Sequence, residues 1–187
     1  MKIPPEAKRV FKGIIFDVYQ WQQKMFDGTK EAFEMIKRVN TVEVIAVKGG
    51  KIVLSHQSQP TKKDFYSLFG GRGEDGENPL VTAKRELLEE SGLSSDKWEL
   101  FKVYQPLHKM DWCIYTYIAR DCRKISEPRL DAGEKIEAKE CNFDEFINIV
   151  ISDKYWGNEL ALDILRMKDK GSLEEFRIKL LGNPFIE

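Results

Sequence analysis

The chain has 187 residues, of which 42% are hydrophobic and 33% are charged, and its formal net charge is −1. A chain of this length forms one domain, or one domain with a small appended segment. The near-neutral charge lacks the basic excess that nucleic acids and anionic membranes attract, so we expect neither as a partner. No apolar run reaches the length of a membrane span and the N-terminus lacks a signal-peptide core, which predicts a cytoplasmic protein. The spacing of Cys113, Cys122 and Cys141 fits no metal site, so we expect reduced thiols and no disulfide.

The first part of the chain predicts a small β segment. Residues 11–22 and 30–37 are rich in aromatic and aliphatic side chains, and they flank Asp27-Gly28, a dipeptide typical of hairpin turns. The second of these runs could instead form a helix. We expect residues 1–40 to form an N-terminal β segment and residues 41–187 to form the main domain.

The main domain alternates predicted strands with predicted helices. Strands are expected at residues 41–48, 51–57, 98–105, 111–120 and 134–141. Helices are expected near residues 79–91, 143–152, 158–169 and 173–181. Gly49-Gly50 joins the first two strands as a hairpin, and Ser172 with Glu175 forms a capping box that opens the last helix. Mixed strands with helices on both sides predict an α/β fold of the α/β/α sandwich type.

The helix at residues 79–91 has clear start and stop signals. Asn78 is a favourable N-cap and Pro79 suits the first helical position. Gly92 follows the last helical residue, where a left-handed backbone conformation is common. These signals fix the boundaries of the helix that carries most of the acidic residues discussed next.

Three glutamates of this helix, Glu86, Glu89 and Glu90, are spaced i, i+3 and i+4 and therefore share one face. Like charges so close destabilise a bare helix, whereas bound divalent cations would make the arrangement favourable. Clustered oxygen ligands suit Mg²⁺ or Mn²⁺. The carbonyl of Gly70, which no side chain shields, could add a further ligand. The sequence thus predicts a metal-dependent enzyme.

The segment from 71 to 93 reads GRGEDGENPLVTAKRELLEESGL and fits the pattern G-x5-E-x7-R-E-U-x-E-E-x-G-U, in which U is aliphatic. Every fixed position is filled, by Gly71, Glu77, Arg85, Glu86, Leu87, Glu89, Glu90, Gly92 and Leu93. The segment therefore resembles the signature of the Nudix hydrolases, which implies hydrolysis of a nucleoside diphosphate linked to a group X. The resemblance implies that Glu86, Glu89 and Glu90 hold Mg²⁺ with the Gly70 carbonyl. It also implies that Glu77 and Arg85 orient the loop and the helix.

The N-terminal segment is similar to that of the ADP-ribose pyrophosphatases within this family. The resemblance rests on residues 16–21 and 26–28, which read FDVYQW and FDG. It implies a homodimer with shared active sites, in which Tyr19, Trp21 and Phe26 could stack on adenine. Alternatively, these aromatic side chains bury against the sheet.

Two positions after the signature resemble the same group. Pro106 resembles a proline that follows the signature in that group, and we expect it to contact the substrate, although proline also commonly marks the end of a strand. Residues 131–137 resemble an acidic loop that supplies the general base, for which Glu134 is the preferred residue and Glu137 the next choice. A glutamate of the helix could serve as the base instead, and the loop could simply be a solvated turn.

One departure from the group concerns the grip on phosphate. An arginine often follows the glutamine of the second main-domain strand, but here residues 56–60 read HQSQP. Lys62, Lys63 or Arg72 could replace it, and we expect Arg72 to contact the substrate.

The sequence therefore predicts a Mg²⁺-dependent Nudix pyrophosphohydrolase that acts on a small nucleotide. The favoured substrate is ADP-ribose or another nucleoside diphosphate sugar, which would give AMP and a sugar phosphate. Hydrolysis of nucleoside triphosphates or dinucleoside polyphosphates is the alternative enzymatic activity. A non-catalytic nucleotide-binding module on the same scaffold is the alternative from another class.

Overall fold

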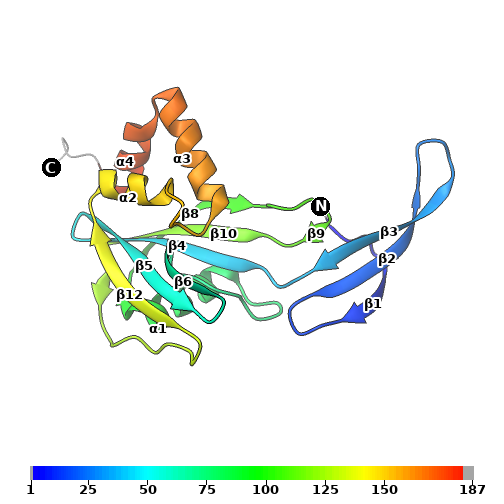
Figure 1. The fold of residues 1–187 in the computed structure, drawn as a ribbon, viewed down its shortest axis with the longest axis horizontal. Helices are drawn as coiled ribbons and strands as arrows, with labels where there is room; N and C mark the ends of the chain where they lie inside the picture. Colours follow the sequence, from blue (N-terminus) through cyan, green and yellow to red (C-terminus); the bar gives the residue numbers. More distant parts are fainter. Residues whose placement is uncertain (1, 183–187) are drawn as a thin grey trace.

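The computed structural model describes residues 2–182 and shows three layers with a projecting N-terminal sheet (Figure 1). The central sheet lies between α1 (Pro79–Ser91) on one face and the C-terminal helices on the other. Those helices are α2 (Phe143–Val150), α3 (Asn158–Lys170) and α4 (Leu173–Leu181). The predicted α/β/α sandwich is therefore confirmed. Within residues 2–182, no helix is both long and apolar enough to cross a membrane.

The central sheet is mixed, with strand order β12-β5-β4-β10-β8, and β6 pairs with β5 beside this path. Its strands are β4 (Thr41–Lys48), β5 (Lys51–Gln59), β6 (Lys62–Ser67), β8 (Lys97–Tyr104), β10 (Ile114–Arg120) and β12 (Lys135–Cys141). The β4–β10 pair is parallel and the other neighbouring pairs are antiparallel. β4 and β5 pair only near their shared turn, so the segment around Phe69–Arg72 lies against the start of β4 instead.

Both faces of the central sheet are apolar, as expected for a sheet covered by helices on each side. The cluster under α1 includes Val42, Val44, Val53, Phe69, Ala83 and Leu87. The cluster under α2, α3 and α4 includes Ile45, Ile52, Leu54, Phe146, Leu160 and Ile164. Alternate residues of β4 therefore face opposite layers, which places Glu43 on the side of the C-terminal helices.

The N-terminal sheet has the order β1-β2-β3-β9, and it extends away from the central sheet (Figure 1). Its strands are β1 (Lys8–Lys12), β2 (Asp17–Lys24), β3 (Lys30–Lys37) and β9 (Met110–Asp111). The β2–β3 hairpin around Asp27-Gly28 is confirmed, so the helical alternative for 30–37 is wrong. The short β9 comes from the main domain and pairs with β3.

Several predicted elements differ from the structure. The strand expected at 11–22 is split by a turn in which the Gly13 N–H donates to the Phe16 carbonyl. The strand expected at 111–120 is likewise divided between β9 and β10. β6 and the short pair β7 (Leu93–Ser94) and β11 (Arg123–Lys124) were not predicted. The other predicted strands and helices are present with small shifts of their ends.

The capping box at Ser172 is wrong. The Ser172 side chain makes no capping hydrogen bond, and its hydroxyl instead faces the carbonyl of Met167 in the preceding helix. Gly171 ends α3 in a left-handed conformation directly before Ser172, so the tight connection between the helices sets the position of that side chain. A capping box is present at α2, between Asn142 and Glu145.

Candidate active site

The acidic helix α1 begins and ends as its sequence predicts. The Asn78 side chain accepts a hydrogen bond from the Leu80 N–H at 2.9 Å, and Pro79 occupies the first turn. Gly92 ends the helix with a φ of 70°. A Cβ on Gly92 would lie 2.0 Å from the carbonyl oxygen of Ser126, so both its conformation and its surroundings require glycine.

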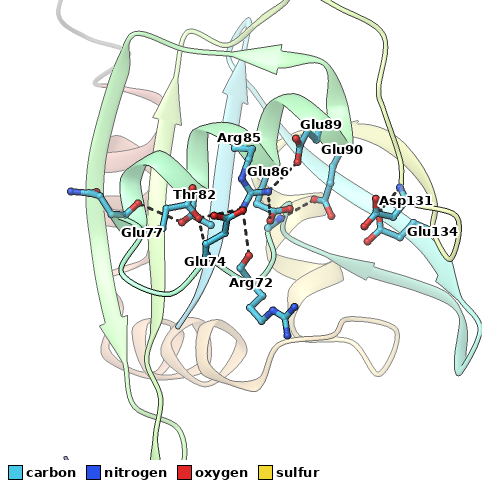
Figure 2. Close-up of polar contacts among 12 residues, drawn as sticks. Arg72, Glu74, Glu77, Thr82, Arg85, Glu86, Glu89, Glu90, Asp131 and Glu134 are labelled. Carbon is cyan, nitrogen blue, oxygen red and sulfur yellow. Dashed lines mark hydrogen bonds and ion pairs between the residues drawn. The ribbon is translucent and has the colours of Figure 1, made fainter. Parts of the chain in front are cut away.

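Arg85 holds two of the predicted metal ligands in place (Figure 2). Its Nη1 donates to Glu86 Oε1 at 2.9 Å and to Glu89 Oε2 at 3.0 Å. Its Nη2 lies 3.5 Å from Glu77 Oε2, which confirms the predicted pair between the loop and the helix. One guanidinium therefore fixes three carboxylates at the edge of α1.

Glu77 is also anchored within its own loop. Its Oε2 accepts a hydrogen bond from the Glu74 N–H at 2.9 Å. This N–H is the main reason that the pKa of Glu77 is lowered, and Thr82 and Arg85 add to the effect. Glu77 is therefore ionised and positions the loop that precedes α1.

The third predicted ligand, Glu90, faces the loop before the helix. Its side chain is buried, and its Oε2 accepts a hydrogen bond from the Gly70 N–H at 2.8 Å. Gly70 has a φ of 151°, and a Cβ there would lie 2.1 Å from the Val42 carbonyl oxygen. A Cβ on Gly71 would lie 2.7 Å from the Glu86 carboxylate. The glycines thus let the backbone approach the acidic face closely.

The charge balance of this face favours a cation. Burial is the main cause that raises the pKa of Glu90 to about 8, and Glu86, Glu134 and Glu89 raise it further. The pKa of Glu86 is raised by burial and by Glu89 and Glu134, although Arg85 opposes this shift. Clustered carboxylates of this kind are stabilised by Mg²⁺ or Mn²⁺, so the residues fit the predicted ions.

The side chains are not yet arranged as a closed set of ligands. Among residues 2–182, no group of three His, Cys, Asp or Glu side chains converges closely enough to hold a metal ion. Arg85 and the Gly70 N–H engage the carboxylate oxygens instead. Binding of a cation would therefore require small rotations of these glutamates, and their role as ligands remains a prediction.

Glu134 approaches the same region from the loop before β12 (Figure 2). Its Oε2 accepts a hydrogen bond from the Asp131 N–H at 3.3 Å, and its charge raises the pKa of both Glu86 and Glu90. Glu137 lines a smaller cavity together with Glu134. The structure thus brings the preferred base near the acidic helix, while its catalytic role stays a prediction.

A cavity of about 700 Å³ adjoins the loop that carries Gly70 and Gly71. Two of the predicted substrate-binding residues, Arg72 and Pro106, line it. Its size suits a nucleotide-sized ligand, and its contact with the glycines connects it to the acidic face.

The other two predicted substrate-binding residues, Tyr19 and Trp21, lie on β2 in the N-terminal sheet and do not line this cavity. The ring of Trp21 packs against Phe33 at 5.1 Å, and its Nε1 donates to Gln23. Phe26 is fully exposed at the tip of the hairpin. Within one chain, none of these side chains reaches the cavity, and their role in stacking remains a prediction that requires a second subunit.

The cavity also contains residues that sequence analysis missed. Arg38 lies over the ring of Trp112 at 4.7 Å, and Glu43 and Tyr155 form another part of the wall. Glu43 could have been found from the sequence, because it is a charged residue between apolar, buried residues of strand β4. Nothing in the local sequence marks Arg38 or Tyr155, because only the fold brings them together.

These features define an acidic helix beside a nucleotide-sized cavity on an α/β/α sandwich. The NUDIX domain model matches residues 37–160, which is more than half of the chain, and the chain therefore belongs to the Nudix family. The predicted class of enzyme, a Nudix pyrophosphohydrolase, is confirmed.

Similar proteins refine the position of the chain within the family. It is 27% identical over 171 residues to the ADP-ribose pyrophosphatase of Bacillus subtilis (strain 168), covering 89% of this chain and 92% of that protein. It is 25% identical over 170 residues to the methanol dehydrogenase activator of Bacillus methanolicus, covering 88% and 92%. A crystal structure of an ADP compounds hydrolase shares the fold, with a TM-score of 0.69, 17% identity and coverage of 90% and 95%.

Proposed function

We propose that this protein hydrolyses the pyrophosphate bond of a nucleoside diphosphate linked to a sugar, with Mg²⁺ as the cofactor and Mn²⁺ as its substitute. ADP-ribose is the favoured substrate, and AMP and ribose 5-phosphate are the expected products. The observation that carries the proposal is the cluster of Glu86, Glu89 and Glu90 beside the cavity wall formed by Gly70 and Gly71. The similarity to an ADP-ribose pyrophosphatase supports the choice of substrate.

The glutamates of α1 would hold the cations together with the Gly70 carbonyl. When bound, divalent cations neutralise phosphate oxygens and lower the pKa of water. Arg85 keeps Glu86 and Glu89 on the same side of the helix, and Glu77 keeps the preceding loop against it. Arg85 and Glu77 thus fix the helix and the loop that carry the site, while the glutamates themselves need only small rotations to receive the cations.

Glu134 is the proposed general base. It lies in an exposed loop and can approach the acidic face, where a proton must be removed from the attacking water. A change of Glu134 to Gln should lower kcat by about 10²–10⁴-fold, the usual contribution of acid–base catalysis. Full activity of this variant would assign the base to a glutamate of α1.

Arg38 and Arg72 are the proposed contacts to the diphosphate. Both line the cavity, and Arg72 forms an isolated β-bridge with Thr41 next to the glycine loop. Burial is the main cause that lowers the pKa of Arg38, and the nearby positive charge of Arg72 lowers it further. Two neighbouring guanidinium groups would be stabilised by an anion, and they replace the arginine that is missing after Gln57.

We also propose that the N-terminal segment forms a homodimer. Val10, Phe11, Ile14, Ile15 and Phe16 are exposed on or next to β1, and such apolar surface commonly marks an interface. In a dimer, Tyr19 and Trp21 could contribute to the site of the other subunit. Light scattering should give twice the mass of one chain, whereas Ile14→Asp should give monomers. A monomeric parent protein at micromolar concentration would contradict this arrangement.

We propose a cytoplasmic location, which agrees with the absence of a disulfide between Cys113, Cys122 and Cys141. All three cysteines belong to the described part of the chain. Fractionation of cells that express the protein would test this proposal.

The proposed activity is tested by a Mg²⁺-dependent screen of nucleotide sugars, dinucleotides and triphosphates, with identification of products. The expected result is cleavage of ADP-ribose to AMP and ribose 5-phosphate. Release of pyrophosphate from triphosphates with no cleavage of ADP-ribose would favour the alternative enzyme. Ligand-induced thermal stabilisation without any product would favour a nucleotide-binding module.

A further inference from the structure

The cavity wall contains polar groups that the proposed mechanism does not use. Glu43 comes from the central strand β4, Tyr155 from the loop before α3, and Glu159 from the first turn of α3. All three line the same cavity as Gly70 and Gly71. They lie on the side of the sheet that faces the C-terminal helices.

Glu43 is an unusual residue for its position. Its neighbours on β4 are Val42, Val44 and Ile45, whose side chains are buried. Its Oε2 accepts one hydrogen bond, from the hydroxyl of Thr116 at 3.3 Å. A carboxylate placed in a sheet interior is costly unless it is paired or serves a ligand.

The two carboxylates of this wall have no cationic partner in the part of the chain that the structure describes. Within residues 2–182, neither Glu43 nor Glu159 forms an ion pair. Lys62 also lines the cavity, but its ammonium group lies over the ring of Trp156 at 4.0 Å. The oxygen atoms of both carboxylates therefore retain acceptor capacity towards the cavity.

Tyr155 gives a second indication of a ligand, which does not depend on the two carboxylates. Its side chain is 8% exposed, and its hydroxyl makes no hydrogen bond within the described residues. Burial is the main cause that raises the pKa of this hydroxyl, and the nearby Glu43, Tyr104 and Glu159 raise it further. A buried hydroxyl without a partner is costly and rare, so it indicates a missing ligand.

The combination of groups selects the chemistry of that ligand. Glu43 and Glu159 need donors, whereas the Tyr155 hydroxyl can both donate and accept. An ammonium group offers no acceptor to Tyr155, and an anion would be repelled by the carboxylates. Sugar hydroxyl groups offer both a donor and an acceptor, and they carry no charge.

We propose that Glu43, Tyr155 and Glu159 form a subsite that binds the hydroxyl groups of the sugar in group X. The subsite selects an uncharged sugar over a phosphate-terminated X. This inference rests on the proposed function, since it places X in the cavity that adjoins the acidic helix. It adds residues that decide which nucleoside diphosphate derivative is bound.

A neighbouring tyrosine offers a matched control. The hydroxyl of Tyr104 donates to Asp163 Oδ2 at 2.7 Å, and Lys102 pairs with the same carboxylate. Tyr104 is therefore satisfied within the protein, and it does not line the cavity. Removal of the hydroxyl should therefore lower stability at Tyr104, whereas at Tyr155 it should weaken ligand binding.

Calorimetry would measure binding of α,β-methylene-ADP-ribose and α,β-methylene-ADP, with Mg²⁺, to the parent protein and to each variant. Tyr155→Phe should bind the sugar analogue about tenfold or more weakly, bind α,β-methylene-ADP normally, and keep or raise the Tm. Tyr104→Phe should lower the Tm and keep the preference for the sugar analogue. Glu159→Gln should weaken binding of the sugar analogue alone.

Two results would overturn the subsite. The first is a parent protein that binds both analogues equally. The second is a Tyr155→Phe variant that binds the sugar analogue normally or loses the same factor for both analogues. These binding experiments do not require hydrolysis. The proposed function would therefore fail separately from the subsite if the protein bound the sugar analogue tightly but hydrolysed no nucleotide.

Discussion

The change of Glu90 to Gln tests the role of the acidic helix in catalysis. Gln has nearly the same shape as Glu, and its amide oxygen can still accept the hydrogen bond that the Gly70 N–H donates at 2.8 Å. The variant therefore removes a charge and keeps the local geometry. We expect it to fold like the parent protein.

The size of the effect follows from the environment of Glu90. It is buried among carboxylates, with Glu86, Glu134 and Glu89 all raising its pKa, so its charge is tolerated only if cations bind nearby. Metal ions supply several kcal/mol of transition-state stabilisation. If the variant loses about 3–5 kcal/mol of it, kcat falls by about 10²–10⁴-fold. The free energy of unfolding without divalent cations should stay the same or rise, because the raised pKa of Glu90 shows that ionisation is unfavourable there, and Gln cannot ionise.

The assay compares steady-state hydrolysis of ADP-ribose with urea unfolding in the presence of a chelator. Glu175→Gln is the matched control, since Glu175 is an exposed residue on α4. Mg²⁺ should raise the Tm of the parent protein and of the control by more than that of Glu90→Gln. A Glu90→Gln variant with kcat within about threefold of the parent protein would refute the assignment of Glu90 as a metal ligand.

Three further predictions follow from specific contacts. Arg85→Lys should lower kcat about 10–100-fold with intact folding, because one ammonium has no second nitrogen to hold Glu77, which Nη2 reaches at 3.5 Å while Nη1 bridges Glu86 and Glu89. Normal turnover in steady-state kinetics would contradict this role. Gly92→Ala should lower the free energy of unfolding by roughly 2–4 kcal/mol, and Gly171→Ala by only about 1 kcal/mol. Both glycines have a positive φ, but only a Cβ on Gly92 would meet a carbonyl oxygen, at 2.0 Å. Equal losses in urea unfolding would contradict this reasoning. Burial raises the pKa of Glu43 from 4.5 to about 7, so the protonated carboxyl contributes stability fully below pH 4.5 and loses it as the pH rises through 7. The stability of the parent protein relative to Glu43→Gln should therefore fall by about 1–3 kcal/mol between pH 5 and 8, and a pH-independent difference would show that this pKa is not raised.

The parts of the fold that the sequence predicted are those set by local signals. Asn78, Pro79 and Gly92 fix the ends of α1 through contacts within a few residues of the chain. The glycine pair 49–50 and the dipeptide 27–28 fix their hairpins in the same way. The Nudix signature then placed the acidic residues on this helix, and its pair between Arg85 and Glu77 is present.

The parts that the sequence could not predict depend on contacts between distant segments. Gly13 looked like part of a continuous strand, but its N–H donates to the Phe16 carbonyl and splits the run. The Ser172 capping pattern was overridden because the connection to α3 places its hydroxyl near Met167. Glu43 and Tyr155 become neighbours of one cavity only when α3 packs on the sheet.

The most direct test of the central claim is a crystal structure with Mn²⁺ and α,β-methylene-ADP-ribose, in which anomalous scattering locates the metal ions. The account predicts anomalous peaks bound by the carboxylates of Glu86, Glu89 and Glu90, with the diphosphate of the analogue beside them. Saturating Mn²⁺ with no peak on this face of α1, or with the diphosphate bound elsewhere, would contradict the account.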